Sequence, residues 1–284
     1  MRKKVYDNYD YEEAYNEQIE KLEEAEAERI AKKHKGAGYR TTTTEAGRMI
    51  EVDIYPTFNV RHDMPRTKRG RESRPAQKNL NDKRARRYLN QLASANFGKG
   101  DLWGTFTYRA GEEPEDIDDA EKKFGNFIRR INRRRKRAGK PNLKYIYVTE
   151  WENGEKGVRC HHHAIFDGDV DRDEIETLWY HGDRTETKRL APDPDTHIAG
   201  LVHYITKDPK GKKRWKTSKG LKKPTITRSY SKFGKNAVRK MAFDRSLIET
   251  ELKKKYKNAR FVDASVFMNE INGGFYIYAR MVRD

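Results

Sequence analysis

The chain has 284 residues, enough for one main domain with appendages or for two small domains. Only 35% of the residues are hydrophobic and 37% are charged, so we expect much of the chain to be solvated surface. The formal net charge of +18 favours a polyanionic partner, above all nucleic acid. We expect a cytoplasmic protein without membrane association, because the sequence shows no spanning apolar run or signal peptide, and its single cysteine excludes an internal disulfide.

The first 74 residues are predicted to be a helical and basic N-terminal extension or linker. Residues 5–34 are rich in Glu, Ala and Lys with few helix breakers, which indicates a helix. Residues 35–74 look irregular and include the basic run 66–71, which is either solvated or lies along a DNA backbone.

A main domain over residues 75–245 is predicted to begin with a helix over 75–95 and a strand over 101–108. The clearest helix of the chain follows over 115–138, with acidic residues in its first turns and basic residues in its last. The basic end exceeds what the helix dipole needs. We therefore expect contact with DNA phosphates from Arg129, Arg130, Arg133 and Arg134.

A β-hairpin is predicted next, from a strand over 143–152 and a strand over 158–166. If its turn centres near residues 155–156, Glu150 lies opposite His161. Helices are expected over 171–180 and 195–208, followed by a basic loop that starts at Lys210 and a short helix within 229–243. Residues 246–284 are expected to form a C-terminal helix and a β-hairpin, with strands over 261–268 and 275–282, which could pack on the main domain.

Two histidines in this hairpin have the spacing of metal ligands. His161 and His163 are at i and i+2 on a strand, so both point to one face, and Glu150 can supply a carboxylate. Glu152 is the alternative third ligand, and a shifted register would make His162 the ligand. The mixed donor set leaves positions open for substrate oxygens and, with no second cysteine available, favours Mn²⁺ or Mg²⁺ over structural zinc.

A tyrosine and a lysine follow one helical turn apart, at Tyr204 and Lys207. A tyrosine oxygen can attack a phosphodiester and hold the new 5′ end as a phosphotyrosine. A neighbouring ammonium group stabilises the charge that develops during this attack. These two residues are therefore the predicted catalytic pair.

The order of these motifs resembles that of the HUH endonuclease superfamily: an aromatic-Thr strand (105–108), a His-x-His strand (161–163) and a Tyr-x-x-Lys helix (204–207). More narrowly, residues 79–224 look like the rolling-circle replication initiators (Rep) of bacterial phages, plasmids and integrative elements. The resemblance implies an α+β fold with a five-stranded antiparallel sheet flanked by helices. It also implies nicking of single-stranded origin DNA, a covalent 5′ link to Tyr204 and a free 3′ hydroxyl.

Host helicase and polymerase are the expected further partners, because the chain has no Walker nucleotide-binding motif and the 3′ hydroxyl would prime a host enzyme. The sequence leaves the oligomeric state open. Two alternatives also remain: an HUH transposase or relaxase, which shares the chemistry, and a non-catalytic DNA- or RNA-binding protein.

Overall fold

The computed structural model describes residues 38–57, 75–151, 159–182, 185–205, 215–269 and 273–283. These residues belong to two compact units. One spans residues 88–223, and the other is built from the segments before and after it, up to Arg87 and from Pro224 onward. The predicted helix over 5–34 and the basic run 66–71 lie outside the described residues.

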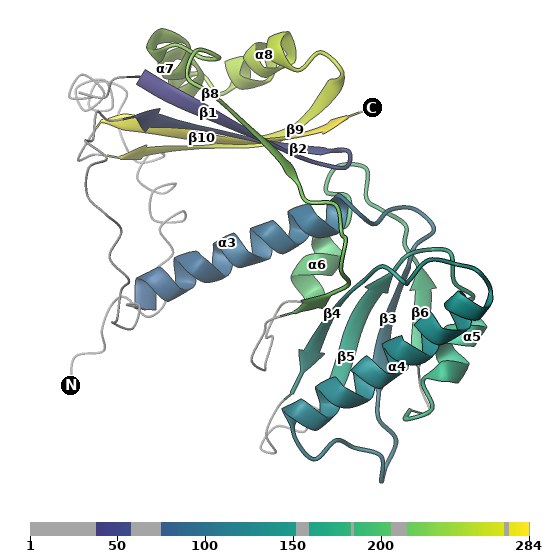
Figure 1. Ribbon diagram of the computed structural model, residues 1–284. Helices are drawn as coiled ribbons and strands as arrows, with labels where there is room; N and C mark the ends of the chain where they lie inside the picture. The colour runs from purple at the N-terminus through teal and green to yellow at the C-terminus, as the bar shows by residue number, and fades with distance from the viewer. Residues whose placement is uncertain are drawn as a thin grey trace, which may run out of the picture. The chain divides into compact units, whose positions relative to one another are not determined.

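The unit of residues 88–223 is built on an antiparallel sheet with the strand order β6-β3-β5-β4-β7 (Figure 1). The strands are β3 (Leu102–Thr107), β4 (Tyr145–Glu150), β5 (His161–Phe166), β6 (Glu186–Arg189) and β7 (Lys216–Thr217). β5 lies in the centre of the sheet, and helices flank it. The predicted α+β fold with a five-stranded antiparallel sheet is confirmed.

One face of this sheet is covered by α4 (Ile117–Arg137) and α5 (Arg172–Leu178). The N-terminus of α4 is capped by Asp116, whose Oδ1 accepts a hydrogen bond from the Asp119 amide at 2.7 Å. Phe124 and Phe127 of α4 are fully buried against Phe106 of β3. Burying each such ring stabilises the fold by roughly 2–3 kcal/mol, which makes this aromatic layer the main core of the unit.

The opposite face is covered by α6 (Ala199–Ile205) and by the C-terminal part of α3 (Pro75–Ser94). Leu89 of α3 and Val202 of α6 share a buried cluster with Ile165 of β5. α6 begins later than residue 195, where the sequence pattern predicts a helix. The side chain of Asp193 accepts hydrogen bonds from the amides of residues 195 and 196 and so holds this stretch in a turn.

The second unit contains another five-stranded antiparallel sheet, in the order β8-β1-β2-β10-β9. Its strands are β1 (Gly38–Ala46), β2 (Met49–Thr57), β8 (Thr225–Ser229), β9 (Ala259–Asn269) and β10 (Gly274–Arg283). Two helices, α7 (Lys235–Phe243) and α8 (Ser246–Lys255), cover one face (Figure 1). Val52 and Ala279 of the sheet are fully buried in a cluster with Val238 of α7.

Residues 38–57 are not irregular, as the composition suggested, but form the hairpin of β1 and β2. Gly47 turns the chain with a φ of 62°, a value that few other residues adopt. The threonines of β1 hid the strand, because Thr41 and Thr43 are buried positions filled by polar residues of high β propensity. The C-terminal hairpin joins this sheet, where β10 pairs with β2.

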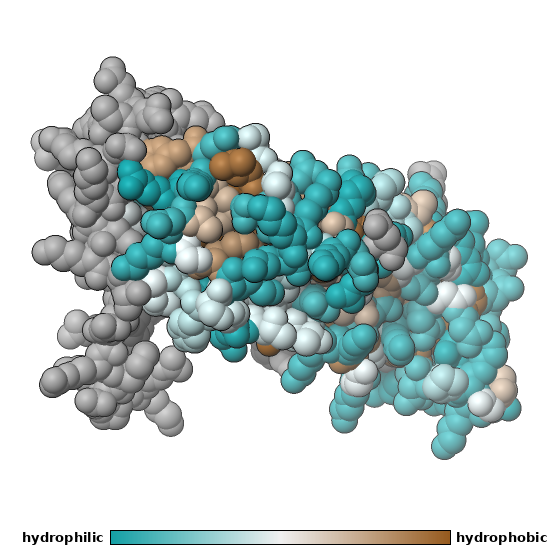
Figure 2. All heavy atoms as spheres, turned by 90° about the horizontal axis from the view of Figure 1, so that it is seen from above, coloured by the Kyte–Doolittle hydropathy of each residue, from teal (hydrophilic) through white to brown (hydrophobic). Residues whose placement is uncertain are grey.

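The surface of the protein is as polar as its composition predicts. Figure 2 shows one face, on which hydrophilic side chains surround a small hydrophobic patch. Among the helices of the described part, none is both long enough and apolar enough to cross a membrane.

Candidate active site

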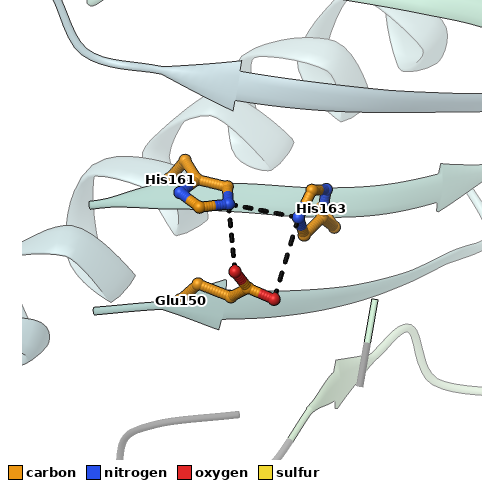
Figure 3. Close-up of side chains that lie close together, drawn as sticks. All are labelled: Glu150, His161 and His163. Atoms are coloured by element: carbon orange, nitrogen blue, oxygen red, sulfur yellow. Dashed lines mark hydrogen bonds and ion pairs between the residues drawn. The ribbon is translucent and has the colours of Figure 1, made fainter. Parts of the chain in front are cut away.

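Three side chains of the central hairpin converge on one face of the first sheet. Glu150 at the end of β4 lies directly opposite His161 at the start of β5, which is the register predicted from the sequence. The Nε2 atom of His161 lies 3.2 Å from Glu150 Oε2 and 3.2 Å from His163 Nε2, and His163 Nε2 lies 3.8 Å from Glu150 Oε1 (Figure 3). These three residues form a cluster that could hold a metal ion.

Both imidazoles are oriented through their other ring nitrogen. His161 Nδ1 donates to the carbonyl of Arg159 at 2.9 Å, which leaves a lone pair on its Nε2. His163 Nδ1 is 3.1 Å from the hydroxyl of Thr105, its cross-strand neighbour on β3. Such hydrogen bonds are typical of metal-binding histidines, because they fix the ring and its tautomer.

The spacing of the donor atoms fits a single ion. Two nitrogens bound at about 2.1 Å and near a right angle lie roughly 3.0 Å apart. The two Nε2 atoms are 3.2 Å apart and the carboxylate of Glu150 faces both, so little rearrangement is needed. Two imidazoles and one carboxylate also leave further positions for oxygen ligands.

The electrostatics of the site keep His163 in the form that binds metal. Its pKa is lowered to about 4, chiefly by burial and next by the neighbouring His161, while Glu150 opposes the shift. The ring is therefore neutral at physiological pH, as a metal ligand must be.

His162 points to the other face and is not a ligand of this cluster. It is fully buried, its Nε2 lies 2.7 Å from Tyr108 Oη, and its Nδ1 lies 2.9 Å from Thr149 Oγ1. Its ring stacks near Phe124 of α4 at 4.4 Å between centroids. Burial lowers the pKa of His162 well below its ordinary value, so the ring is a neutral part of the core. The alternative register, with His162 as the ligand, is wrong.

Tyr204 lies on α6, on the same face of the sheet as the cluster. Its ring is 5.2 Å from the ring of His163, with the two planes at 64°. The side chain is 57% exposed, although Val202 and Ile205 of the same short helix are buried. Tyr204 is thus both beside the cluster and open to solvent. The other predicted residues of this region, Lys207, Lys210 and Glu152, lie outside the described residues.

The basic end of α4 lies on the opposite face from the cluster. The guanidinium of Arg130 stacks 4.1 Å from the Tyr180 ring centre and donates to the Leu178 carbonyl at 3.1 Å. Arg134 pairs with Glu174 at 3.1 Å. These arginines therefore join α4 to the α5 region. Their role in DNA binding stays a prediction, as does that of Arg129 and Arg133.

Another arginine of this helix has a structural role that the sequence pattern did not reveal. Arg135 is buried, and it donates to the carbonyl of Pro141 at 2.7 Å and to that of Asp169 at 2.6 Å. Two buried carbonyl partners explain part of the excess of positive charge at this helix end, which the sequence had suggested for phosphate contact.

The comparison with family models identifies the class of protein to which this unit is similar. Residues 101–209 match the family described as Replication-associated protein ORF2/gene II protein. The matched segment contains the whole of β3, β4, β5 and α6, and therefore the cluster and Tyr204. The match is consistent with a rolling-circle replication initiator. No curated protein and no solved structure gave a significant match.

Proposed function

We propose that the protein is a metal-dependent, site-specific endonuclease that nicks single-stranded DNA and so initiates rolling-circle replication. The observation that carries the proposal is the position of Tyr204. An exposed tyrosine at a two-histidine, one-carboxylate cluster pairs a nucleophile with a site for a phosphate-binding cation. The family match over the same residues supports a role in replication.

The residues have the following roles in the proposed reaction. Glu150, His161 and His163 would hold Mn²⁺ or Mg²⁺, which when bound polarises the scissile phosphate. The hydroxyl of Tyr204 loses its proton and forms a bond to phosphorus, while the bond from phosphorus to the 3′ oxygen breaks. That oxygen takes up a proton and leaves as a free 3′ hydroxyl, and the 5′ phosphate stays on the tyrosine. Lys207 is the proposed stabiliser of the developing charge.

The proposed DNA partner is a single-stranded origin segment, and Arg129, Arg130, Arg133 and Arg134 are candidates for contacts to its backbone. A host helicase would open the duplex and a host polymerase would extend the 3′ hydroxyl. An HUH transposase or relaxase would share this chemistry and differ in the fate of the covalent DNA. A non-catalytic DNA- or RNA-binding protein would bind the strand without forming any covalent product.

The test is covalent capture of DNA. The full-length protein is incubated with Mn²⁺ and labelled single-stranded oligonucleotides that tile the DNA around its own gene, and the products are separated in SDS. We expect an SDS-resistant adduct with one sequence, lost in Tyr204→Phe and in His161→Ala and suppressed by EDTA. Tyr180→Phe is the matched control, because this exposed tyrosine lies on the α4–α5 side of the sheet.

Two outcomes would contradict the proposal. An adduct that persists in Tyr204→Phe removes the nucleophile, and one that forms equally well with EDTA and His161→Ala removes the metal cluster. If oligonucleotides bind tightly but no sequence gives an adduct, the non-catalytic alternative replaces the nuclease.

A further inference from the structure

The second sheet has a face that α7 and α8 do not cover. Tyr39 and Thr43 of β1 face these helices, because Tyr39 is part of the core and Thr43 bonds to Tyr256 at the end of α8. The residues between them, Arg40 and Thr42, therefore face the other side (Figure 1). This side of the sheet is polar and aromatic rather than apolar.

Four residues form a patch on this face beside the edge strand β8, which we call the β1–β8 patch: Arg40, Tyr55, Arg228 and Tyr230. The guanidinium of Arg40 lies 4.7 Å from the ring centre of Tyr55 and 5.9 Å from that of Tyr230. It also donates to the hydroxyl of Tyr55 at 2.5 Å and to that of Tyr230 at 3.3 Å. Arg228 pairs with Thr42 across the strands and so shares their face.

The patch is open to solvent although its rings are held in place. Tyr230 is 66% exposed, the largest value among the exposed large hydrophobic side chains of the described residues. Arg228 is exposed as well. An aromatic ring that is oriented by a guanidinium yet left in water gives little to the stability of the fold, and it is the kind of surface on which a planar ligand stacks.

The charge of the patch is positive, because the carboxylates of this face are paired elsewhere. Asp53 is bound by Arg87 at 2.6 Å, and Asp263 is bound by Arg280. Within the described part of the chain, Arg40 has only tyrosine partners. Its cationic edge therefore remains available to an anion.

The geometry points to a second nucleic-acid site: the β1–β8 patch binds single-stranded DNA, with bases stacked on Tyr230 and Tyr55 and phosphates contacted by Arg40 and Arg228. Aromatic rings and arginines on an open sheet face are suited to this ligand, because every base offers a flat surface and every nucleotide a charge. The choice of DNA over RNA rests on the proposed function. The recognition itself is expected to be independent of base sequence.

The test measures binding of the full-length protein to fluorescein-labelled oligothymidine by anisotropy. Tyr230→Ala is expected to weaken binding by roughly fivefold or more, as loss of one base stack does, whereas Tyr230→Phe keeps the ring and binds nearly as the wild type. Arg228→Gln is expected to weaken binding and to lower the salt dependence by about 0.7 units of slope.

Two matched controls separate the patch from general effects. Thr227→Ala changes the neighbouring residue of β8, which pairs with Thr43 and so faces the helices. Lys253→Gln removes one positive charge from α8 on the covered side of the sheet. Both are expected to bind oligothymidine within about twofold of the wild type.

The result distinguishes this site from the nuclease. Tyr230→Ala is expected to form the covalent adduct at saturating oligonucleotide, while Tyr204→Phe forms none but binds oligothymidine normally. Wild-type affinity of Tyr230→Ala would overturn the second site and leave the nuclease standing. Tighter, Tyr230-dependent binding of oligouridine than of oligothymidine would overturn the assignment to DNA.

Discussion

Replacing His162 with leucine tests the division of the histidine triplet between two faces of the sheet. Leucine nearly fills the volume of the imidazole, so the cavity is small, but it offers no partner to the hydroxyls of Tyr108 and Thr149. Both residues are less than 5% exposed, so water cannot take the place of the ring. A buried polar group without a partner costs about 1–3 kcal/mol. We expect His162→Leu to lower the free energy of unfolding by about 2–4 kcal/mol.

A double-mutant cycle isolates this cause. Tyr108→Phe removes one of the two hydroxyls, so adding it to His162→Leu is expected to recover about 1–2 kcal/mol relative to additivity. Tyr145→Phe is the matched control, since Tyr145 belongs to the same core cluster and is expected to be additive. Urea unfolding followed by tryptophan fluorescence measures all variants, because the ring of Trp179 lies 5.8 Å from that of His162.

Metal binding gives the second measurement. His162→Leu is expected to bind Mn²⁺ within about twofold of the wild type where it is folded, because His162 faces away from the cluster. Strict additivity of His162→Leu and Tyr108→Phe would refute the account of the buried hydrogen bonds. Loss of Mn²⁺ affinity in folded His162→Leu would refute the assignment of the ligands.

Three further changes test other parts of the structure. Glu150→Gln removes the only carboxylate of the cluster and is expected to weaken Mn²⁺ binding, measured by calorimetry, by more than the 10- to 100-fold typical of an outer-shell partner; unchanged affinity would exclude it as a ligand. Burial raises the pKa of Cys160 to about 12, so iodoacetamide should alkylate the folded protein far more slowly than the urea-unfolded protein at pH 8, with a rate that rises about tenfold per pH unit up to pH 10; equal rates would contradict this. Arg87→Ala leaves the buried carboxylate of Glu51 without its partner at 2.6 Å and is expected to cost about 2–3 kcal/mol in urea unfolding, less than a fully buried pair because Arg87 is 37% exposed; Arg87→Ala with Glu51→Gln should recover part of it.

The cluster could be predicted because its geometry is local. The alternation of β4 and β5 fixes which side chains share a face, and the polar turn residues between them fix the register of Glu150 against His161. The same alternation sends His162 into the core. The helix of Tyr204 could be predicted from its buried Val202 and Ile205, although its contact with His163 is a tertiary one that only the structure shows.

The second sheet could not be predicted, because its pairings join distant parts of the chain. Thr41 and Thr43 look polar in the sequence, and they become core positions only when α7 and α8 pack on β1. In the same way, the arginines of α4 look like one basic surface in the sequence. The carbonyls that bind Arg135 belong to other segments, so no local pattern separates this buried arginine from its exposed neighbours.

The nesting of one unit inside the other has a consequence for how the protein is made and cut. Ile54 of β2 lies opposite Ile277 of β10, so this sheet stays incomplete during translation until the last strands emerge, when residues 88–223 can already be folded. A fragment that starts at residue 75 lacks β1 and β2 and leaves the edge of β10 open to other chains. Residues 88–223 are the contiguous fragment to express alone, whereas the other unit needs its two segments joined by a short linker.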